Sequence, residues 1–252
     1  MARGLEKGMT LGGRFRLEEL VGSGGMGSVY AATDLERGHR VAVKVLKRRF
    51  AERTEFRERF VAESRAAQLI PHPHILTVHD HGVSEGWHFI AMALAPTDLA
   101  SMLEAEGTLP VQRALNIVEQ VAWALDVAHE HGVVHRDVKP ENVLVRPRRT
   151  ADEPDHAWLA DFGIAKLESA ERGLTRTGVF VGTVNYASPE QAAAAELDGR
   201  SDQYALACVL FECLTGRPPF SGLDADGVLR AHALSERPRA SAVRPGLPPA
   251  LD

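Results

Sequence analysis

The polar segment at residues 135–142, which reads HRDVKPEN, holds several side chains suited to group transfer. Asp137 is a carboxylate that can accept or orient the proton of an attacking hydroxyl group. Lys139 can neutralise charge on the transferred group, and Asn142 offers an amide oxygen of the kind that Mg²⁺ prefers. The segment therefore predicts general-base chemistry beside a divalent cation. A charged surface loop, the alternative interpretation, leaves the octapeptide as a whole unexplained.

A second carboxylate, Asp161, is followed by Phe162 and Gly163. A carboxylate on a glycine-flanked turn can ligate the same cation as Asn142. So short a pattern recurs by chance, and its weight comes from its position after residues 135–142. We expect Asp161 and Asn142 to be the metal ligands.

A glycine-rich segment at residues 22–27 reads GSGGMG and fits the pattern G-x-G-x-x-G. Glycines let the backbone approach phosphate groups, whose charge is met by peptide N–H groups. The pattern alone is weak, because an ordinary glycine-rich turn also fits it. Residues 28–30, Ser-Val-Tyr, favour a strand, whereas a dinucleotide-binding fold needs a helix there. The segment therefore predicts a hairpin flap that covers a nucleotide.

Lys44 stands in the run Val41–Leu46, whose other residues are apolar. A lysine on an edge strand that faces water is the simpler interpretation. Glu63 lies in the helical segment that follows, however, and a lysine pinned by a glutamate gives the fixed positive charge that α- and β-phosphates need. We expect Lys44 and Glu63 to act together.

The elements that position these residues fall into two classes. Apolar and β-branched residues alternate between 15 and 46, which predicts paired strands, and further strands are expected near 77–79 and 88–92. Helical periodicity predicts helices at 54–69, 113–131 and 202–214. A β-rich part should therefore precede a helical part, with the boundary near 93–96. Residues 146–156 predict a polar surface hairpin loop, and the Pro- and Arg-rich residues 235–252 predict an irregular loop.

Composition limits the class of protein. The 252 residues are 44% hydrophobic and 25% charged, as in soluble globular proteins, and the net charge of −5 argues against a nucleic-acid partner. We find no apolar run long enough for a membrane segment and no signal peptide. Cys208 and Cys213 lie in one apolar helical segment, which is typical of inert thiols in a reducing compartment. We expect a cytoplasmic location, although the parent protein can be membrane-anchored.

Taken together, these motifs resemble the catalytic domain of eukaryotic-type protein kinases over roughly residues 11–250, with every element in the family's order. Lys139 marks serine/threonine rather than tyrosine kinases, and residues 24–27, 182–183 and 188–191 are similar to bacterial receptor-type serine/threonine kinases. The resemblance implies a bilobal α+β fold: a five-stranded sheet with one helix, a mainly helical lobe, and ATP in the cleft between them. The implied boundaries are an N-lobe at 1–92, a hinge at 93–96 and a C-lobe at 97–252.

The resemblance also assigns roles by position. It implies that adenine lies between Ala42, Val29 and Leu144, that the Ala93 carbonyl and Ala95 amide bind it, and that Met92 gates the inner pocket. Further ATP contacts are expected from Leu20, Val21, Gly22, Ser23, Gly24, Gly25, Met26, Gly27 and Ser28. Thr175 and Thr177 occupy the positions of activating phosphates, for which Arg136 is the expected partner. Structural roles are implied for Arg136, Phe162, Gly163, Thr183, Glu190 and Asp202.

The implied activity is transfer of the γ-phosphoryl group of Mg-ATP, with Mn²⁺ as an alternative cation, to Ser or Thr hydroxyls of proteins in bacterial signal transduction. Autophosphorylation within a homodimer is a further implication. Three features depart from the family. The stretch 92–96 lacks an acidic residue and is one residue short, and the 146–156 loop is long. The family also continues through further helices, one of which brings an arginine to Glu190. We therefore expect a fragment in which Glu190 has lost its partner and the 202–214 helix exposes apolar surface.

Other interpretations fit less well. A pseudokinase acting as a binding module would lack Lys44, Asp137 or Asp161, and all three are present. A P-loop NTPase needs Gly-Lys-Ser/Thr at the end of the glycine loop, and a dinucleotide oxidoreductase needs a helix there. Histidines are dense enough to hold a structural metal at positions 72, 74, 79 and 81, but no cysteine or carboxylate cluster accompanies them.

Overall fold

The computed structural model describes residues 5–150, 153–162 and 184–252, apart from the side chains at 59, 62, 63 and 65–67. Gly163, Thr175, Thr177 and Thr183 therefore lie outside the described residues. The chain divides into two compact units: the first is Met1–Pro71 with Leu76–Ala95, and the second is His72–Ile75 with Pro96–Asp252. The assignment of residues 93–96 as a hinge stays a prediction.

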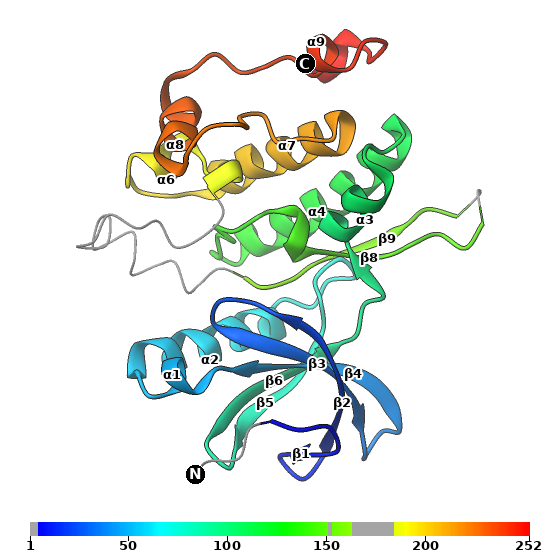
Figure 1. Ribbon diagram of the computed structural model, residues 1–252, viewed down its shortest axis with the longest axis vertical. Helices are drawn as coiled ribbons and strands as arrows, with labels where there is room; N and C mark the ends of the chain where they lie inside the picture. Colours follow the sequence, from blue (N-terminus) through cyan, green and yellow to red (C-terminus); the bar gives the residue numbers. More distant parts are fainter. Residues whose placement is uncertain (1–4, 151–152, 163–183) are drawn as a thin grey trace. The chain divides into compact units, whose positions relative to one another are not determined.

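The first unit is an antiparallel sheet with two helices (Figure 1). Its strands run in the order β1-β2-β3-β4-β6-β5, with the bounds β1 Thr10–Leu11, β2 Phe15–Ser23, β3 Gly27–Asp34, β4 His39–Leu46, β5 Val78–Ser84 and β6 Trp87–Ala93. Six strands replace the expected five, because β1 is only two residues long and too short to show a periodicity. Val41, Val43 and Val45 alternate along β4 and are buried in the apolar core on one face of the sheet.

Helices α1 (Arg48–Ala51) and α2 (Thr54–Leu69) follow β4, and α2 has the predicted bounds. The prediction of paired strands between residues 15 and 46 is also confirmed, and the register of β3 and β4 makes these two strands a hairpin. Its turn is closed by Asp34, whose carboxylate accepts hydrogen bonds from the backbone N–H groups of Glu36 and Arg37. The guanidinium of Arg14 binds the same carboxylate and holds its pKa well below the usual range.

The second unit is mainly helical. The helices of eight or more residues among its described residues are α3 (Leu99–Glu106), α4 (Val111–Glu130), α7 (Gly199–Thr215) and α8 (Ala225–Leu234). Helix α4 lies beside α7 (Figure 1), and the apolar stripe of α4 is buried against it. The shorter elements are α6 Pro189–Ala192, α9 Ala240–Val243 and the 3₁₀ turns η1 Pro140–Asn142, η3 Val184–Tyr186 and η4 Pro249–Leu251.

Helix α7 does not expose the apolar surface that the sequence led us to expect. Leu206, Val209 and Leu214 are buried, and Leu210 is half-buried. Cys208 and Cys213 are buried as well, and burial raises the pKa of each thiol to about 12, which keeps them protonated and inert as predicted.

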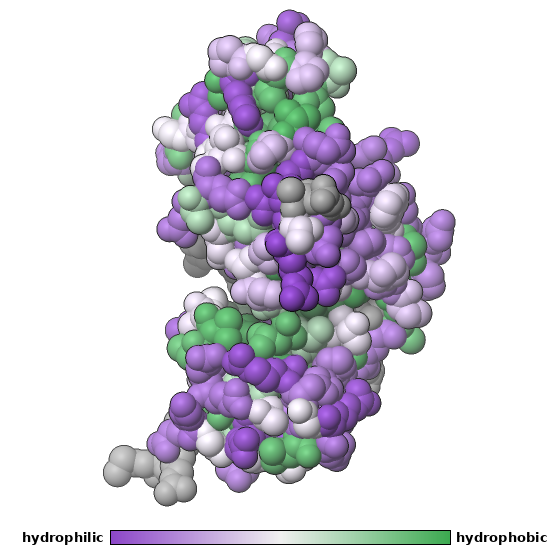
Figure 2. Space-filling model, turned by 90° about the vertical axis from the view of Figure 1, so that its right-hand side faces the viewer, coloured by the Kyte–Doolittle hydropathy of each residue, from purple (hydrophilic) through white to green (hydrophobic). Residues whose placement is uncertain are grey.

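A three-stranded antiparallel sheet completes the second unit, with the strands β7 (Thr97–Asp98), β8 (Val143–Arg146) and β9 (His156–Leu159). The predicted hairpin loop joins β8 to β9, and hydrophilic side chains surround it in Figure 2. One residue of the loop, Asp155, is nonetheless buried. The other described residues between the two strands are exposed, so the prediction of a surface hairpin loop is confirmed apart from Asp155.

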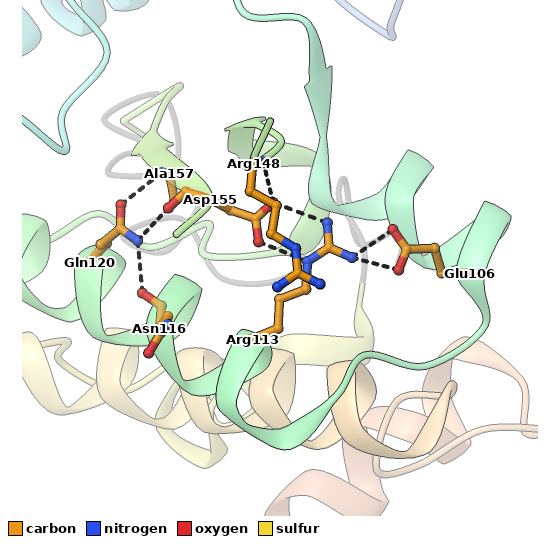
Figure 3. Close-up of polar contacts among 7 residues, drawn as sticks. All are labelled: Glu106, Arg113, Asn116, Gln120, Arg148, Asp155 and Ala157. Carbon is orange, nitrogen blue, oxygen red and sulfur yellow. Dashed lines mark hydrogen bonds and ion pairs between the residues drawn. The ribbon is translucent and has the colours of Figure 1, made fainter. Parts of the chain in front are cut away.

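Asp155 is buried because α4 supplies its hydrogen-bond partners (Figure 3). Arg113 binds the Asp155 carboxylate with two nitrogens, at 2.7 and 3.0 Å, and also pairs with Glu106 of α3. Gln120 donates to the Asp155 carbonyl and accepts from the N–H of Ala157, both at 2.9 Å. These contacts join the base of the loop to α3 and α4, which is the role that the sequence did not reveal.

Residues 235–252 are more ordered than the irregular loop that we predicted. They form α9 and η4, and they bury Ala240 and Leu247. Arg244 donates to the carbonyl of Leu214 (2.9 Å) at the end of α7 and to that of Leu109 (3.0 Å), which lies just before α4. Among the helices that the structure describes, none combines the length and the apolar character needed to cross a membrane.

Candidate functional site

The glycine-rich segment forms a hairpin in the first unit, as predicted. Strands β2 and β3 pair up to Ser23 opposite Ser28, and the residues between them form the tip. At Gly27 a Cβ atom would lie 2.9 Å from the backbone oxygen of Val45, so no larger residue fits without a shift of the neighbouring strand. Leu20 and Val21, on the approach to the tip, are exposed.

Carbonyl groups at the tip are bound by residues that the sequence analysis missed. Lys47 Nζ donates to the carbonyl of Gly24, Arg49 Nη2 donates to that of Gly25 at 3.2 Å, and the Lys47 backbone N–H donates to Met26 at 2.9 Å. No sequence signal marks this contact, because a run of three basic residues after a strand is ordinary surface composition.

Lys44 is not on an edge strand, so that alternative interpretation was wrong. Strand β4 lies between β3 and β6, and Lys44 is opposite Val29 on one side and Ile90 on the other. Ala42, opposite Met92, shares this face because it is two residues from Lys44. The sheet thus places Val29, Ala42, Lys44 and Met92 on the face opposite the apolar core. Glu63 lies in α2, but its side chain is outside the described set, and its pairing with Lys44 stays a prediction.

The stretch after β6 offers backbone groups for recognition. The N–H of Ala93 donates to the carbonyl of Thr77 at 2.9 Å, so this donor is already engaged, and the expected roles of the Ala93 carbonyl and the Ala95 amide stay predictions. Asp98, the first carboxylate after this stretch, caps α3 by accepting from the N–H and hydroxyl of Ser101.

In the second unit, the backbone of residues 135–137 is fixed by buried polar groups. The Asp202 carboxylate accepts from the N–H groups of His135 and Arg136, both at 2.7 Å. Gln191 donates to the Arg136 carbonyl at 2.9 Å. Arg136 adopts φ of 66°, a left-handed conformation that non-glycine residues hold only where their surroundings enforce it. Asp202 provides that constraint, which its predicted structural role did not specify.

His135 orders the residues next to Asp137. Its side chain is fully buried, and burial lowers the pKa of the imidazole, so the ring is neutral. Nε2 donates to the carbonyl of Ala160 (3.0 Å), and Nδ1 accepts from the N–H of Asp137 (3.3 Å). The ring also packs against Phe162 at a centroid distance of 4.9 Å. His135 thereby connects the Asp137 loop to the Asp161 segment, as an apolar partner alone could not.

The polar side chains of the octapeptide converge on Asp137. Lys139 Nζ lies 2.8 Å from Asp137 Oδ2, and Asn142 Nδ2 donates to the Asp137 carbonyl (2.7 Å) and to Oδ2 (3.2 Å). The structure therefore brings these three residues together as the sequence predicted. Leu144 follows in β8 and is half-buried.

The donor set suits a hard divalent cation. Because Asn142 uses its amide nitrogen toward Asp137, its amide oxygen is the group left to ligate a metal. Asp161 is exposed and has φ of 58°, a conformation in which aspartate is enriched. One amide oxygen and one carboxylate match Mg²⁺, which proteins often bind through one or two carboxylates together with substrate phosphates.

Glu190 accepts a hydrogen bond from a serine that the sequence analysis did not consider, while the expected loss of an arginine partner stays a prediction. The hydroxyl of Ser201 donates to Glu190 Oε1 at 2.9 Å, and Glu190 is only partly buried. Its neighbours Ser188 and Gln191 form a capping box at the start of α6. The spacing Ser-x-x-Gln is a sequence signal for that cap, and it could have identified Gln191, whose side chain also reaches Arg136.

Histidine 129 is a further residue that the sequence analysis missed. Its Nε2 lies 2.8 Å from Asp202 Oδ2, and this hydrogen bond raises the pKa of His129 despite partial burial. Of the four histidines considered as metal ligands, His74 instead bonds to the carbonyl of Ala157 and His79 packs against His39. In the part of the chain that the structure describes, no three His, Cys, Asp or Glu side chains are grouped to hold a metal ion.

Comparisons with known proteins agree with these features. A family model described as protein kinase domain matches residues 15–242. Serine/threonine-protein kinase PknD of Mycobacterium tuberculosis is 45% identical over 242 residues, which cover 95% of this chain and 35% of the relative. Serine/threonine-protein kinase PknE of Mycobacterium bovis is 46% identical over 241 residues, which cover 95% of this chain and 41% of the relative. This chain thus spans well under half the length of both.

Solved structures give the same answer for the fold. A crystal structure of the Mycobacterium tuberculosis PknI kinase domain is similar with a TM-score of 0.71 and 35% sequence identity, over 97% of this chain and 87% of that chain.

Proposed function

This chain belongs to the protein kinase family and has its α+β fold, and we propose that it transfers the γ-phosphoryl group of ATP to serine or threonine hydroxyls of proteins. The arrangement around Asp137 carries the proposal: a carboxylate 2.8 Å from the Lys139 ammonium, on a backbone that Asp202 fixes. A pseudokinase scaffold would have little use for this arrangement. The serine/threonine assignment follows the similarity to the serine/threonine-protein kinases PknD and PknE and the lysine at position 139.

Each unit contributes a different part of the reaction. In the first unit, the glycine-rich hairpin and Lys44 bind the phosphates, and Val29, Ala42 and Met92 hold the base. In the second unit, Asp137 orients the acceptor hydroxyl and takes its proton, and Lys139 neutralises charge on the group in transfer. Leu144 is the contribution of this unit to binding the base.

We assign Asn142 and Asp161 as ligands for Mg²⁺, with Mn²⁺ as a substitute, because both donors are oxygens. A cation held by these two residues would neutralise charge on the phosphate oxygens. Thr175 and Thr177 are proposed phosphoacceptors, and their phosphorylation would activate the enzyme. One copy of the chain would phosphorylate another, either within a homodimer or when two free monomers meet. A phosphate there carries about −1.5 to −2 charges and can bind Arg136, which is adjacent to Asp137.

The proposal is tested by incubating the chain with labelled ATP and a generic basic protein, with Mg²⁺, with Mn²⁺ and with a chelator. We expect label on serine and threonine in both proteins, with Mg²⁺ required and Mn²⁺ able to replace it. A double Thr175→Ala, Thr177→Ala variant should label its substrate more slowly. ATP binding without any phosphotransfer under all metal conditions would favour a binding module over an enzyme.

A further inference from the structure

The tip of the glycine-rich hairpin is held from one side by the residues that directly follow β4. Three successive carbonyls, those of Gly24, Gly25 and Met26, accept hydrogen bonds there. Lys47 binds the first with its ammonium and the third with its backbone N–H, and Arg49 binds the second with its guanidinium. Two residues thus determine the orientation of three consecutive peptide groups.

The orientation of a carbonyl determines that of the next N–H group. The peptide bonds here are trans, and in a trans peptide the C=O and the following N–H point in opposite directions. The carbonyls of residues 24–26 are turned toward Lys47 and Arg49, so the N–H groups of residues 25–27 are turned away from them. Successive N–H groups that point to one side form a concavity that binds anions.

We propose that Lys47 and Arg49 are positioning residues for the phosphate groups of ATP, because they orient the peptide N–H groups at the hairpin tip. This inference rests on the proposed function, since it takes the nucleotide to be the ligand of the hairpin. The two side chains act from the carbonyl side, so they prepare the phosphate-binding face without occupying it. Glycine makes such support necessary, because its backbone otherwise samples many conformations.

A matched set of variants tests the proposal: Lys47→Met and Arg49→Met, Lys47→Arg as the conservative replacement, and Arg48→Met as the control. Arg48 belongs to the same short helix, but its guanidinium lies over the ring of Trp87, 4.5 Å from the centroid. A single hydrogen bond of this kind changes an equilibrium roughly twofold to tenfold. We therefore expect KM for ATP to rise roughly fivefold in each methionine variant. The kcat should change less, Lys47→Arg should restore KM, and Arg48→Met should match the wild type.

Two binding measurements separate positioning from general damage. The affinities for ATP and ADP should fall in Lys47→Met while that for adenosine, which has no phosphate, stays the same. Without nucleotide, the amide NMR signals of Gly25 and Met26 should shift in Lys47→Met and stay in place in Arg48→Met, because the N–H groups are oriented before ATP binds.

An unchanged KM in both methionine variants, or an equal loss of adenosine affinity, would overturn the inference. Unmoved amide signals would overturn it too, and would indicate that the two cations contact phosphate directly. Should Lys47→Met prove unstable, Arg49→Met and the amide signals decide the question. A wild-type chain that binds no nucleotide would overturn the proposed function and this inference with it, whereas a wild type that binds ATP as well as its variants do would overturn the inference alone.

Discussion

The Asp137 loop and the glycine-rich hairpin are both held by hydrogen bonds to backbone groups, but their partners differ in burial. The Asp137 loop is anchored by Asp202, which is 1% exposed, and by the fully buried His135. Gly24 and Gly25 are exposed, and Arg49, one of the two residues that bind them, is exposed as well.

This difference in burial implies a difference in stiffness. A buried donor that loses its acceptor finds no water to replace it, so the hydrogen bonds of Asp202 are expensive to break. At the surface water competes, and the bonds to Gly24 and Gly25 can open readily. A general base must be held close to its working position, whereas a flap has to admit and release nucleotide. We infer that the two modes of support match these two tasks.

The sharpest test of the comparison is Asp202→Asn. However the new amide is turned, its NH₂ group faces the N–H of either His135 or Arg136, and a buried acceptor is lost. We expect the free energy of unfolding to fall by about 3–5 kcal/mol, as when one partner of a buried pair is removed, together with most of the phosphotransfer. Urea denaturation measures the first effect. Asp198→Asn, the same change at the exposed N-cap of α7, is the control and should be nearly neutral, since Asn also caps helices. Equal stability of the two variants would show that burial is not what makes the hydrogen bonds of Asp202 costly to lose.

The next test separates the role of Asp137 in the transfer step from the hydrogen bonds that hold its loop. Asp137→Asn should slow phosphotransfer about 10²–10⁴-fold, the usual contribution of a positioned general base. ATP affinity should stay nearly the same, because the phosphates are assigned to the hairpin and Lys44. Single-turnover rates and nucleotide titration measure the two quantities. A loss of ATP affinity as large as the loss of rate would contradict the assigned role.

A third variant tests whether a buried polar pair away from the Asp137 loop is as costly to break as the contacts of Asp202. Arg113→Met leaves the buried carboxylate of Asp155 without its guanidinium partner. We expect a loss of about 2–3 kcal/mol in the free energy of unfolding, somewhat less than the roughly 3–5 kcal/mol of a fully buried pair, because Arg113 is 12% exposed. Arg149→Met, a change at an exposed position of the same loop, should leave thermal and urea unfolding unchanged. If both variants unfold alike, Asp155 finds other partners.

The stability that the Arg113–Asp155 pair contributes should depend on pH through the carboxyl group of Asp155. Burial alone would raise the pKa of its carboxyl group, but the hydrogen bonds from Arg113 outweigh it, and the pKa lies below the ordinary value of 3.8. A lowered pKa gives stability that is present above the unfolded value and is lost as pH falls through the folded one. The stability difference between the wild type and Arg113→Met should therefore narrow in acid.

The smallest expected effect concerns His129. Its hydrogen bond to Asp202 raises its pKa above 6.5, so its contribution to stability is fully present below that value and is lost as pH rises through the folded pKa. The advantage of the wild type over His129→Gln should be largest in mildly acidic solution and shrink in alkali. Burial lowers the pKa of His135 and His232, so these two histidines make the stability of both proteins rise with pH. The quantity to measure is therefore the difference in free energy of unfolding between the wild type and His129→Gln, in which this shared contribution cancels. An advantage that does not vary with pH would mean that His129 acts as a neutral donor.

The sequence by itself determined the local elements and the chemistry of their residues. The glycine hairpin, the strand that holds Lys44, the helix at 54–69 and the convergence on Asp137 all follow from periodicity, turn residues and close spacing. Contacts between distant segments were decided by tertiary structure alone. Arg113 reaches Asp155 across 42 positions and Arg244 reaches Leu109 across 135, and neither partner is marked by its neighbours. A buried polar group takes whichever partner the packed chain brings within reach, and packing is not a property of any short stretch of sequence.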